Sequence, residues 1–590
     1  MPDARPLLAI VDFADDVLSA PVRRRFESPL HQLRADALAE VIPVLDEADR
    51  LARSGLWVVG FVSYDAAPAF DSAFHAARDA TMPLACFAAF TGHGVEAPTD
   101  DVDAHVVGSV LTSESAVSDG DYDDGVQRVH EHIAAGDVYQ VNLTVPFVGS
   151  SSLDPIDLYE RLRCAQRGRY SAYLDFGDFQ IMSASPELFF ERHDTTLRTR
   201  PMKGTAVRGL DSARDLDARR TLIESEKDRA ENVMIVDVAR NDVGRIARTG
   251  TVRVTSLCDA ERYPRVWQLT STVEGQVEPE IALSRVFSAL FPPASITGAP
   301  KVRATRIIRA LERTARGVYC GAIGLIRPGG DATFNVAIRT AWSRDDGRTV
   351  RLSAGGGVTI DSTPAGELAE LRAKLEAFTV PAPRPSLFET IRFEHGRPVR
   401  LERHLARLSA SADYFDLPFD ESRAREQLAR AGLLACEWPA ARCRLVLSPN
   451  GSLDALAEPF VDAPAHAPAR MVALALEPVD TRDVRIYHKT TERAPYERAL
   501  SAAGAAFDVL LWNESGEATE LSRGNLVAAI AGERFTPPVS CGLLGGTLRA
   551  ELLESRAIAE RVLTLEALRG AERLWFINSL RGWVPITLGD

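Results

Sequence analysis

Three carboxylates in two separate stretches have the types and spacing to bind a hard cation. In "GGGVTIDSTPAGELAELRAKLEAF" (355–378), Glu367, Glu370 and Lys374 recur at helical spacing and share one helix face. Glu231 heads the apolar-periodic run of "ESEKDRAENVMIVDVARNDVGRI" (224–246). Such carboxylates suit Mg2+, which takes oxygen ligands and keeps waters for a substrate. A solvated, charged helix face has the same spacing, so spacing alone leaves both interpretations open.

A lysine and an acid upstream could belong to the same site. Lys203 lies in "RPMKGTAVRG", between proline and glycine residues that usually mark a surface turn. The strand-like run before it, "QIMSASPELFFERH", carries a lone acid, Glu187, between a proline and an apolar pair. The pattern fits either a solvated turn lysine or an amine directed at a ligand.

Two glycine-rich turns could bring backbone close to a ligand. The triple glycine at 355–357 permits close approach of the main chain. The stretch "FPPASITGAPKVRATRIIRALE" (291–312) runs into a helix whose first N–H groups could hold an anion. It lacks the spacing of a P-loop, so nucleotide binding is not supported.

The elements that must position these residues predict a mixed α+β fold. Strand-like runs such as "GLWVVGFVSYDAA", "GAIGLIR" and "VRLSAGGGVTI" do not alternate strictly with helices, which argues against a Rossmann fold. At "FTVPAPRPSLFETIR" three prolines fall between a helix-like run and an alternating strand. We therefore expect a domain at 1–380, a linker at 381–386 and a second domain at 387–590.

Composition limits the kinds of partner. The 590 residues carry a net charge of −14, which disfavours nucleic acid. The N-terminus has acids where a signal peptide needs a basic flank, and no apolar run could span a membrane. The seven cysteines form no CxxC pair, which is typical of reduced thiols in a cytoplasmic protein.

The motifs of the first part resemble one enzyme family. "SPELFF", "RPMKGT", "EKDRAENVMIVDVARND", "ASITGAPKVRA", "YCGAIG", "AIRT" and "SAGGGVTIDSTPAGELAELRAK" occur in this order. Together they resemble the chorismate-utilising enzymes, which include anthranilate, isochorismate and aminodeoxychorismate synthases. The resemblance covers most of 120–380 and implies a two-sheet α+β fold with the active site between the sheets.

This resemblance also implies roles for individual residues. Mg2+ would be bound through Glu231 and Glu370, with Glu367 assisting through water. Chorismate would be held by Thr297, Tyr319, Arg339, the Gly355 and Gly356 backbone, and Lys374. The chain departs from the family pattern at Gln268, where many members have histidine.

Lys203 acquires a catalytic role from the same resemblance. A lysine in the PxKGT motif is typical of the members that make aminodeoxychorismate, whereas anthranilate synthases carry alanine there. The lysine amine would add at C2 of chorismate while the 4-hydroxyl leaves, and ammonia would then add at C4 and expel it. Glu187 is the matching acid for the departing hydroxyl. Desolvation would favour the neutral amine that this attack requires.

The second part resembles the fold-type IV pyridoxal phosphate enzymes, an α/β fold shared by class IV aminotransferases and aminodeoxychorismate lyase. Its motifs are "LERHLARL", "IYHKTTERAPYERAL", "SGEATELSRGNLVAAI", "CGLLGGTLRAELL" and "FINSLRGWVPI". The resemblance implies that Lys489 carries the cofactor and that Glu520 faces its pyridine nitrogen. The phosphate would be bound by Arg407 and the Gly546–Thr547 backbone, with Asn578 and Ser579 as further candidates.

Together the two resemblances predict a bifunctional enzyme that makes 4-aminobenzoate, the folate precursor, from chorismate and ammonia. None of the cysteines lies in the Gly-x-Cys-x-Gly turn of a glutaminase, so we expect ammonia from a separate glutamine amidotransferase subunit. A homodimer formed through the second domain is a further expectation. The alternatives are an anthranilate- or isochorismate-type synthase fused to a class IV aminotransferase, and a second domain that is a non-catalytic interaction module.

Overall fold

The computed structural model describes residues 7–15, 20–96, 111–344, 348–379, 383–462 and 468–589. The chain divides into two compact units. Unit 1 comprises Met1–Val207 and Ala218–Ala382, and unit 2 comprises Arg208–Asp217 and Pro383–Asp590. Of the predicted linker at 381–386, residues 381 and 382 lie outside the described residues.

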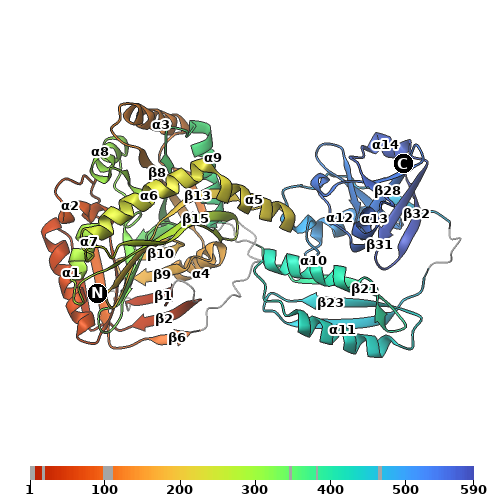
Figure 1. The fold of residues 1–590 in the computed structure, drawn as a ribbon, viewed down its shortest axis with the longest axis horizontal. Helices are drawn as coiled ribbons and strands as arrows, with labels where there is room; N and C mark the ends of the chain where they lie inside the picture. Colours follow the sequence, from red (N-terminus) through yellow and green to blue (C-terminus); the bar gives the residue numbers. More distant parts are fainter. Residues whose placement is uncertain are drawn as a thin grey trace. The chain divides into compact units, whose positions relative to one another are not determined.

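Unit 1 is built on two large antiparallel sheets (Figure 1). In spatial order the first sheet contains β16 (Gly298–Ala299), β8 (Gln140–Ser151), β20 (Thr349–Val358), β19 (Thr340–Arg344), β10 (Phe179–Ser185), β9 (Tyr170–Asp175), β1 (Leu8–Ala14), β2 (Pro21–Glu27) and β6 (Gly94–Glu96), with β7 (Leu111–Ser115) paired to β8. The second contains β13 (Met202–Val207), β15 (Val266–Gln276), β12 (Thr196–Arg200), β11 (Leu188–His193), β18 (Ala332–Val336), β17 (Ala322–Ile326), β4 (Trp57–Val62), β5 (Ala85–Phe90) and β3 (His31–Ala35), with β14 (Arg253–Arg262) paired to β15.

The two sheets pack face to face because each strand sends alternate apolar side chains into a shared core. In β17, Ile323 and Leu325 pack with Val11 of β1 and Ile181 of β10 between the sheets. The flanking Ala322 and Ile326 belong to a second core on the outer face. The order of layers is therefore helix, sheet, sheet, helix.

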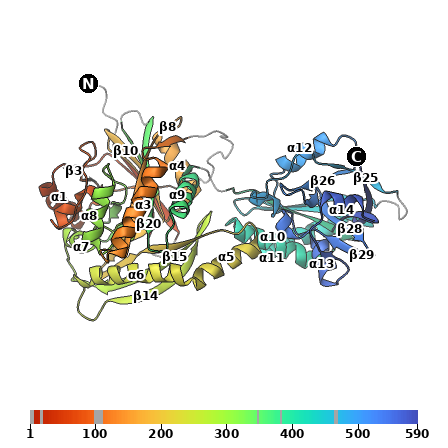
Figure 2. The ribbon, with the colours of Figure 1, turned by 90° about the horizontal axis from the view of Figure 1, so that it is seen from above.

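Helices cover the outer faces of both sheets. Outside the second sheet lie α1 (Leu38–Arg53), α2 (Ala67–Phe70) and α7 (Leu283–Leu290). Outside the first lie α3 (Asp119–Ala134), α4 (Pro155–Gln166), α8 (Lys301–Leu311) and α9 (Pro364–Thr379), with α3 against α9 (Figure 2). The long helix α6 (Glu226–Gly244) packs on β13 and β15. These last two strands carry Lys203 and Gln268, so α6 is the helix nearest the candidate lysine.

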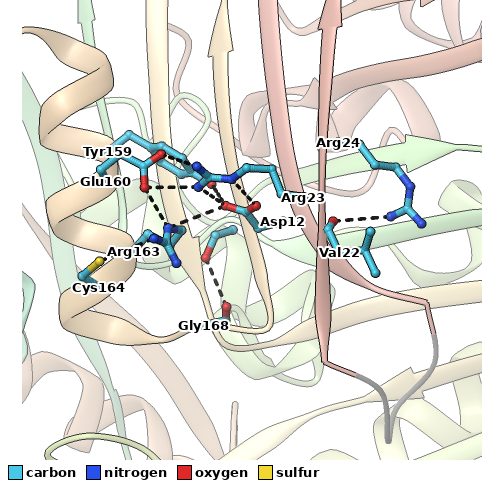
Figure 3. Close-up of polar contacts among 10 residues, drawn as sticks. Asp12, Val22, Arg23, Arg24, Tyr159, Glu160, Arg163, Cys164 and Gly168 are labelled. Atoms are coloured by element: carbon cyan, nitrogen blue, oxygen red, sulfur yellow. Dashed lines mark hydrogen bonds and ion pairs between the residues drawn. The ribbon is translucent and has the colours of Figure 1, made fainter. Parts of the chain in front are cut away.

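A buried ionic network ties the edge of the first sheet to its helix layer (Figure 3). Arg23 of β2 donates to both carboxylate oxygens of Asp12 in β1, each at 2.8 Å. Tyr159 of α4 donates to the same carboxylate at 2.5 Å, and Glu160 pairs with Arg23 at 2.8 Å. Since these charges are paired and hydrogen-bonded, they can be buried without a large desolvation penalty.

Unit 2 contains two smaller sheets. The first has the order β22 (Arg397–Pro398), β21 (Leu387–Glu394), β23 (Ala440–Leu447) and β24 (Leu453–Pro459), with helices α10 (Leu401–Tyr414) and α11 (Glu421–Ala435). The second has the order β27 (Ala518–Leu521), β26 (Asp508–Trp512), β25 (Arg470–Leu474), β32 (Gly582–Leu588), β31 (Arg573–Asn578), β28 (Gly524–Ile530), β29 (Glu533–Thr536) and β30 (Ala559–Glu560). Because β27 also pairs with β28, six of these strands close into a barrel. Helices α12 (Ala494–Ala502), α13 (Thr547–Glu554) and α14 (Leu565–Arg569) surround it.

The predicted fold class is confirmed for both halves. The quoted strand-like runs form strands β4, β17 and β20, and the runs at 224–246 and 355–378 contain α6 and α9. The seven cysteines are all free thiols. Across the described ranges, every helix is too short or too polar to cross a membrane.

Candidate active site

The sequence candidates of unit 1 converge on one cavity of about 370 Å³. Both sheets line it, as do the two helices that carry the carboxylates. Its lining residues include Asn142, Glu187, Lys203, Lys227, Asp228, Glu231, Gln268, Ser295, Ile296, Tyr319, Arg339, Gly355, Gly357, Glu367, Glu370 and Lys374. The cavity thus holds cations for an anionic substrate beside carboxylates for a metal.

Lys203 and Glu187 lie in this cavity with protonation states suited to chemistry. Burial lowers the pKa of the Lys203 amine, although the nearby Glu231 carboxylate opposes this effect. Burial raises the pKa of Glu187 to about 7, against the Ser295 hydroxyl, which donates to the carboxylate, and against Lys203. Burial thus favours the neutral form of both the amine and the carboxyl, the forms that a nucleophile and a general acid require.

The third glycine of the triple-glycine strand makes room for the Lys203 side chain. A Cβ built on Gly357 of β20 would lie 2.7 Å from Lys203 Nζ and 1.7 Å from Gln140 Nε2. Gln140 is fully buried, and neither polar atom of its amide has a hydrogen-bond partner among the described residues. The amide and the amine therefore crowd the same point in front of Gly357.

Local structure fixes the position of Lys203 on β13. Gly204 has φ +93°, and a Cβ there would approach Asp228 of α6 to 3.1 Å, so the lysine is followed by a residue that only glycine fits well. Asn232 of α6 donates to the carbonyl oxygens of Lys203 at 3.1 Å and Leu269 at 3.2 Å. The helix that carries Glu231 is thereby bonded to the lysine strand.

The three predicted metal carboxylates reach the same cavity from α6 and α9. Glu370 pairs with Lys374 at 2.5 Å, and this neighbour lowers the pKa of Glu370. Glu367 accepts from Ser362 through Oε1, while its buried Oε2 has no partner within the described residues. Burial raises the pKa of both Glu231 and Glu367, and a bound cation would favour their ionised forms.

These residues fit Mg2+ as a site completed by its substrate. Among the described residues, no group of three or more His, Cys, Asp and Glu side chains is arranged to hold a metal alone. The partnerless Oε2 of Glu367 nevertheless marks a buried acceptor that a cation or its water would satisfy. Mg2+ commonly takes one or two protein carboxylates and leaves its other positions to water and substrate.

Of the predicted chorismate-binding residues, Tyr319, Arg339, Gly355 and Lys374 line the cavity. Arg339 donates to the carbonyl of Lys374 at 2.8 Å, and Lys374 donates to the carbonyl of Gly355 at 2.8 Å. These bonds join two cations in a chain across β20 and α9, where they could meet the carboxylates of a dianionic substrate.

Two other predicted substrate residues are not among those that line the cavity. Thr297 is fully buried, and its hydroxyl donates to Pro293 O at 2.9 Å. Ser295, two residues earlier, faces the cavity instead. Gly356 does not line the cavity, and a Cβ built on it would lie 2.5 Å from Glu367 Oε2. Its smallness therefore serves the position of Glu367.

Sequence reasoning missed Gln140, Asn142 and Ser295. Arg316 supports this wall from behind, since it donates to Asn142 O at 2.7 Å and to Ile296 O at 2.9 Å. The stretch "YQVNLT" carries the signal, because its alternation places two amides, Gln140 and Asn142, on one face of the strand and the apolar Val141 and Leu143 on the other. Gln268, which departs from the family pattern, lines the cavity from β15.

In unit 2, Lys489 and Glu520 are buried groups whose pKa values are shifted in opposite directions. Burial, reinforced by Arg407, lowers the pKa of Lys489 to about 7, and its Nζ lies 4.7 Å from the centre of the Phe388 ring. Burial also raises the pKa of Glu520 to about 7, against the Tyr496 hydroxyl that donates to it at 2.8 Å. Each group can change its protonation state near neutral pH.

The predicted phosphate-binding residues gather around a buried acid that the sequence did not reveal. Arg407 donates to both oxygens of Glu389, at 2.8 and 2.6 Å. His404 joins Glu389 at 2.6 Å to Ser579 at 2.9 Å. Burial opposes ionisation of Glu389, but Arg407 and His404 outweigh it and hold its pKa at about 2. The guanidinium is thereby fixed.

The Gly546–Thr547 backbone, which is predicted to bind the phosphate, lies beside this cluster. The Arg407 guanidinium donates to Gly545 O at 3.1 Å, and α13 begins at Thr547, directly after Gly546. Thr547 Oγ1 lies 3.4 Å from His404 Nε2. Asn578 is turned away, since its side chain bonds the backbone of Arg523, Leu580 and Arg581 around the β31–β32 turn.

The donor set fits pyridoxal phosphate. A fixed arginine beside a helix start suits a phosphate, because the first N–H groups of a helix have no intrahelical acceptor. A buried amine of lowered pKa suits an aldehyde, and a buried acid suits a pyridine nitrogen. Lys489, Arg407 and Glu520 supply these three groups within one unit.

Comparison with known proteins divides the chain at the same place. Residues 6–380 match the chorismate binding enzyme family, and residues 386–588 match the class IV amino-transferases. Aminodeoxychorismate synthase component 1 of Bacillus subtilis (strain 168) is 41% identical over 249 residues, which are 42% of this chain and 53% of that protein. Anthranilate synthase component 1 of Aquifex aeolicus is 39% identical over 257 residues, 44% of this chain and 52% of that protein.

The chain spans about half the length of these curated relatives. Among solved structures, anthranilate synthase component I from Streptococcus pneumoniae superposes with a TM-score of 0.50 at 26% identity. That match covers 63% of this chain and 90% of the other.

Proposed function

The chain belongs to the chorismate binding enzyme family and continues into a class IV amino-transferase domain, and from this premise we propose that it makes 4-aminobenzoate in two steps. Unit 1 would convert chorismate and ammonia to 4-amino-4-deoxychorismate. Unit 2 would release pyruvate from that product with the help of pyridoxal phosphate.

The observation that carries the proposal is the presence of both Lys203 and Glu187 in the lining of the unit 1 cavity. An amine of lowered pKa beside a carboxyl of pKa about 7 supplies a nucleophile and an acid in one place. A synthase that used ammonia directly at C2 would have no need of a lysine nucleophile there. The similarity to the Bacillus subtilis aminodeoxychorismate synthase supports the same choice.

The proposed first step balances without a redox partner. The neutral Lys203 amine forms a bond to C2 of chorismate, the ring double bonds shift, and the C4–O bond breaks. Glu187 gives its proton to the departing hydroxyl, which leaves as water. Ammonia then bonds to C4, the double bonds shift back, and the C2–N bond to Lys203 breaks.

Glu231, Glu370 and Glu367 would hold Mg2+, which supplies charge stabilisation at the substrate carboxylate when bound. Arg339 and Lys374 would hold the anionic substrate, because their mutual hydrogen-bond chain fixes both at the cavity wall. Tyr319 lies at the same wall. In this proposal these side chains would orient the ring with its C2 toward Lys203.

In unit 2, bound pyridoxal phosphate supplies an electron sink for the substrate amine. Arg407 and the start of α13 would bind its phosphate, and Glu520 would face the pyridine nitrogen. Lys489, freed when the substrate amine replaces it, would remove the C4 proton and return a proton to the departing enolpyruvate. Aromatisation of the ring favours loss of pyruvate.

The lyase reaction is preferred to amino-group transfer because the unit 1 product is its substrate. This preference rests on the fusion and not on site residues, since both reactions use the same lysine and acid. Ammonia would come from a separate glutamine amidotransferase subunit, a partner consistent with the component 1 names of the relatives. We also propose that the protein is cytoplasmic.

An anthranilate-type synthase is the second candidate, because several relatives bear that name. Lys203 argues against it, since amination at C2 requires no lysine at that carbon. An isochorismate-type reaction requires a base to activate water. A neutral Lys203 amine could act as that base, so product analysis with and without ammonium separates this reaction from amination.

The test is incubation with chorismate and ammonium, with and without Mg2+ and pyridoxal phosphate, followed by mass analysis of products. We expect 4-aminobenzoate and pyruvate when both cofactors are present, and aminodeoxychorismate when pyridoxal phosphate is withheld. Formation of 2-aminobenzoate or isochorismate instead would refute the proposal. If no pyridoxal phosphate absorbance is retained after gel filtration, the second half is an interaction module.

A further inference from the structure

Unit 2 contains ten residues, Arg208–Asp217, that lie in sequence between Lys203 and Glu231. We call this segment the arm. It is folded around an ion pair, since Arg208 and Asp215 meet at 2.7 Å with side chains only 4% and 6% exposed. Asp215 also accepts from Gly209 N at 3.1 Å. The last six residues of the arm, Ser212–Asp217, are the start of helix α5 (Ser212–Glu224).

The first contact of the arm with the rest of unit 2 leads to the lysine segment. The Arg208 guanidinium donates to Tyr414 O at 3.1 Å and lies 4.2 Å from the centre of that ring. Tyr414 also packs against His488, with ring centres 4.4 Å apart. His488 is 4% exposed, bonds Ser411 at 2.9 Å, and directly precedes Lys489.

A second contact leads toward the buried acid Glu520. Leu210 packs against an apolar cluster that contains Tyr487 and Tyr496. Arg214 lies 4.5 Å from the centre of the Tyr487 ring. Tyr496 in turn donates to Glu520 at 2.8 Å. The arm thus touches side chains next to Lys489 in sequence and next to Glu520 in space.

We propose that the arm positions the cofactor-binding lysine and acid of unit 2, so that the second half is completed by residues embedded in the synthase sequence. Arg208 and Leu210 are the positioning residues, acting through Tyr414–His488 and through Tyr487–Tyr496. The inference rests on the proposed binding of pyridoxal phosphate by unit 2. It identifies the partner of this unit 2 surface as the chain's own segment 208–217.

Removal of the Arg208 guanidinium should disturb the contacts of the arm with Tyr414. The guanidinium fork binds the Asp215 carboxylate and the Tyr414 carbonyl at once, a geometry that suits arginine and not lysine. Without it, the buried Asp215 carboxylate and the Tyr414 carbonyl each lose a hydrogen bond, and the Tyr414 ring loses its contact with the guanidinium. The His488–Lys489 backbone would then have one packed neighbour free to shift.

The experiment uses full-length Arg208→Met and Asp215→Asn proteins. Arg430→Met is the matched control, because Arg430 pairs with Glu426 on the same unit at 2.6 Å with both side chains more than half exposed. For each protein we would measure the dissociation constant of pyridoxal phosphate from its absorbance, the pH dependence of that absorbance, and chorismate consumption with ammonium.

We expect the two arm variants to bind pyridoxal phosphate about tenfold to a hundredfold more weakly, the effect of misplacing a reacting group by about an ångström. The pH dependence of the cofactor absorbance should shift, because Lys489 would lie in a changed environment. Chorismate consumption should stay within about twofold of the wild type. The control should match the wild type in all three measurements.

An Arg208→Lys protein keeps the inference testable if Arg208→Met unfolds. It retains the charge beside Asp215, but one ammonium cannot reproduce the fork, so an intermediate affinity is expected. Wild-type affinity and pH dependence in both Asp215→Asn and Arg208→Lys would overturn the inference. A wild-type chain that binds no pyridoxal phosphate would instead refute the proposed function of unit 2.

Discussion

Replacing Gly357 by alanine should remove synthase activity while the protein stays folded. The new methyl group would lie 1.7 Å from Gln140 Nε2 and 2.7 Å from Lys203 Nζ, far inside contact distance. Both atoms are the ends of flexible side chains, so both can move away. We therefore expect the fold to survive and the lysine to be displaced.

The size of the two effects follows from this geometry. Moving two side chain ends to other rotamers should cost about 1 kcal/mol of unfolding free energy. To restore a carbon–nitrogen contact of about 3.5 Å, Lys203 Nζ must move by nearly 1 Å. A misplacement of about 1 Å at a reacting group costs about a hundredfold in rate, or about 2.7 kcal/mol in the barrier.

The neighbouring glycines provide contrasts in the same strand. A Cβ on Gly355 would meet the backbone oxygen of Leu143 at 2.4 Å, so Gly355→Ala should lose about 1–3 kcal/mol of stability. Gly356→Ala would instead push Glu367 Oε2, at 2.5 Å, and should raise the Mg2+ concentration needed for turnover. Gly120→Ala, with open space around it, is the neutral control.

The assay is kcat/KM for chorismate consumption with ammonium, together with thermal unfolding and lyase activity on supplied aminodeoxychorismate. For Gly357→Ala we expect a synthase loss of about a hundredfold, near-native unfolding and unchanged lyase activity. Synthase activity within about threefold of the wild type would mean that the amine in front of Gly357 does not attack the substrate.

Four further changes test the assigned roles. Lys203→Ala should stop aminodeoxychorismate formation and spare the lyase, and equal loss of both activities would contradict a role confined to unit 1. Glu231→Ala or Glu370→Ala should abolish Mg2+-dependent turnover, as chelation does. Undiminished turnover of the wild type in excess chelator would show that the metal assignment is wrong. Because Glu187 must be protonated and its pKa is about 7, synthase kcat should fall as pH rises through 7, and Glu187→Gln should lose that dependence along with most activity. The Lys489→Ala protein should consume chorismate and accumulate aminodeoxychorismate, which an added active lyase should then convert. Formation of 4-aminobenzoate by this variant at the wild-type rate would show that Lys489 is not the catalytic lysine.

Much of the fold and the centre of each site could be predicted from sequence, because these features are local. Glu367, Glu370 and Lys374 share a helix face through spacing alone, and all three line the cavity. The strands at β17 and β20 follow from unbroken apolar runs and a triple glycine. Ordered motifs then joined stretches that spacing could not connect.

What sequence could not predict depends on contacts between distant segments. Gln140 was overlooked because its burial and its two partnerless amide atoms arise only when β8 pairs with β20. Glu389 became visible only when α10 brought Arg407 and His404 against it. Ser295 and Thr297 share one turn, and only the turn geometry shows which of them faces the cavity.

The full division of the chain into two units also depends on contacts between distant segments. The boundary near the prolines could be placed from composition, but the arm at 208–217 has no compositional mark. Contacts such as that of Arg208 with Tyr414, which joins residues about two hundred positions apart, place it in unit 2.

The central claim is tested most directly by mass analysis of the products that the wild-type chain forms from chorismate and isotopically labelled ammonium, with Mg2+ and pyridoxal phosphate present. The account predicts 4-aminobenzoate that carries the label on its 4-amino group, with one pyruvate released for each molecule. Labelled 2-aminobenzoate, or unlabelled isochorismate, would contradict it.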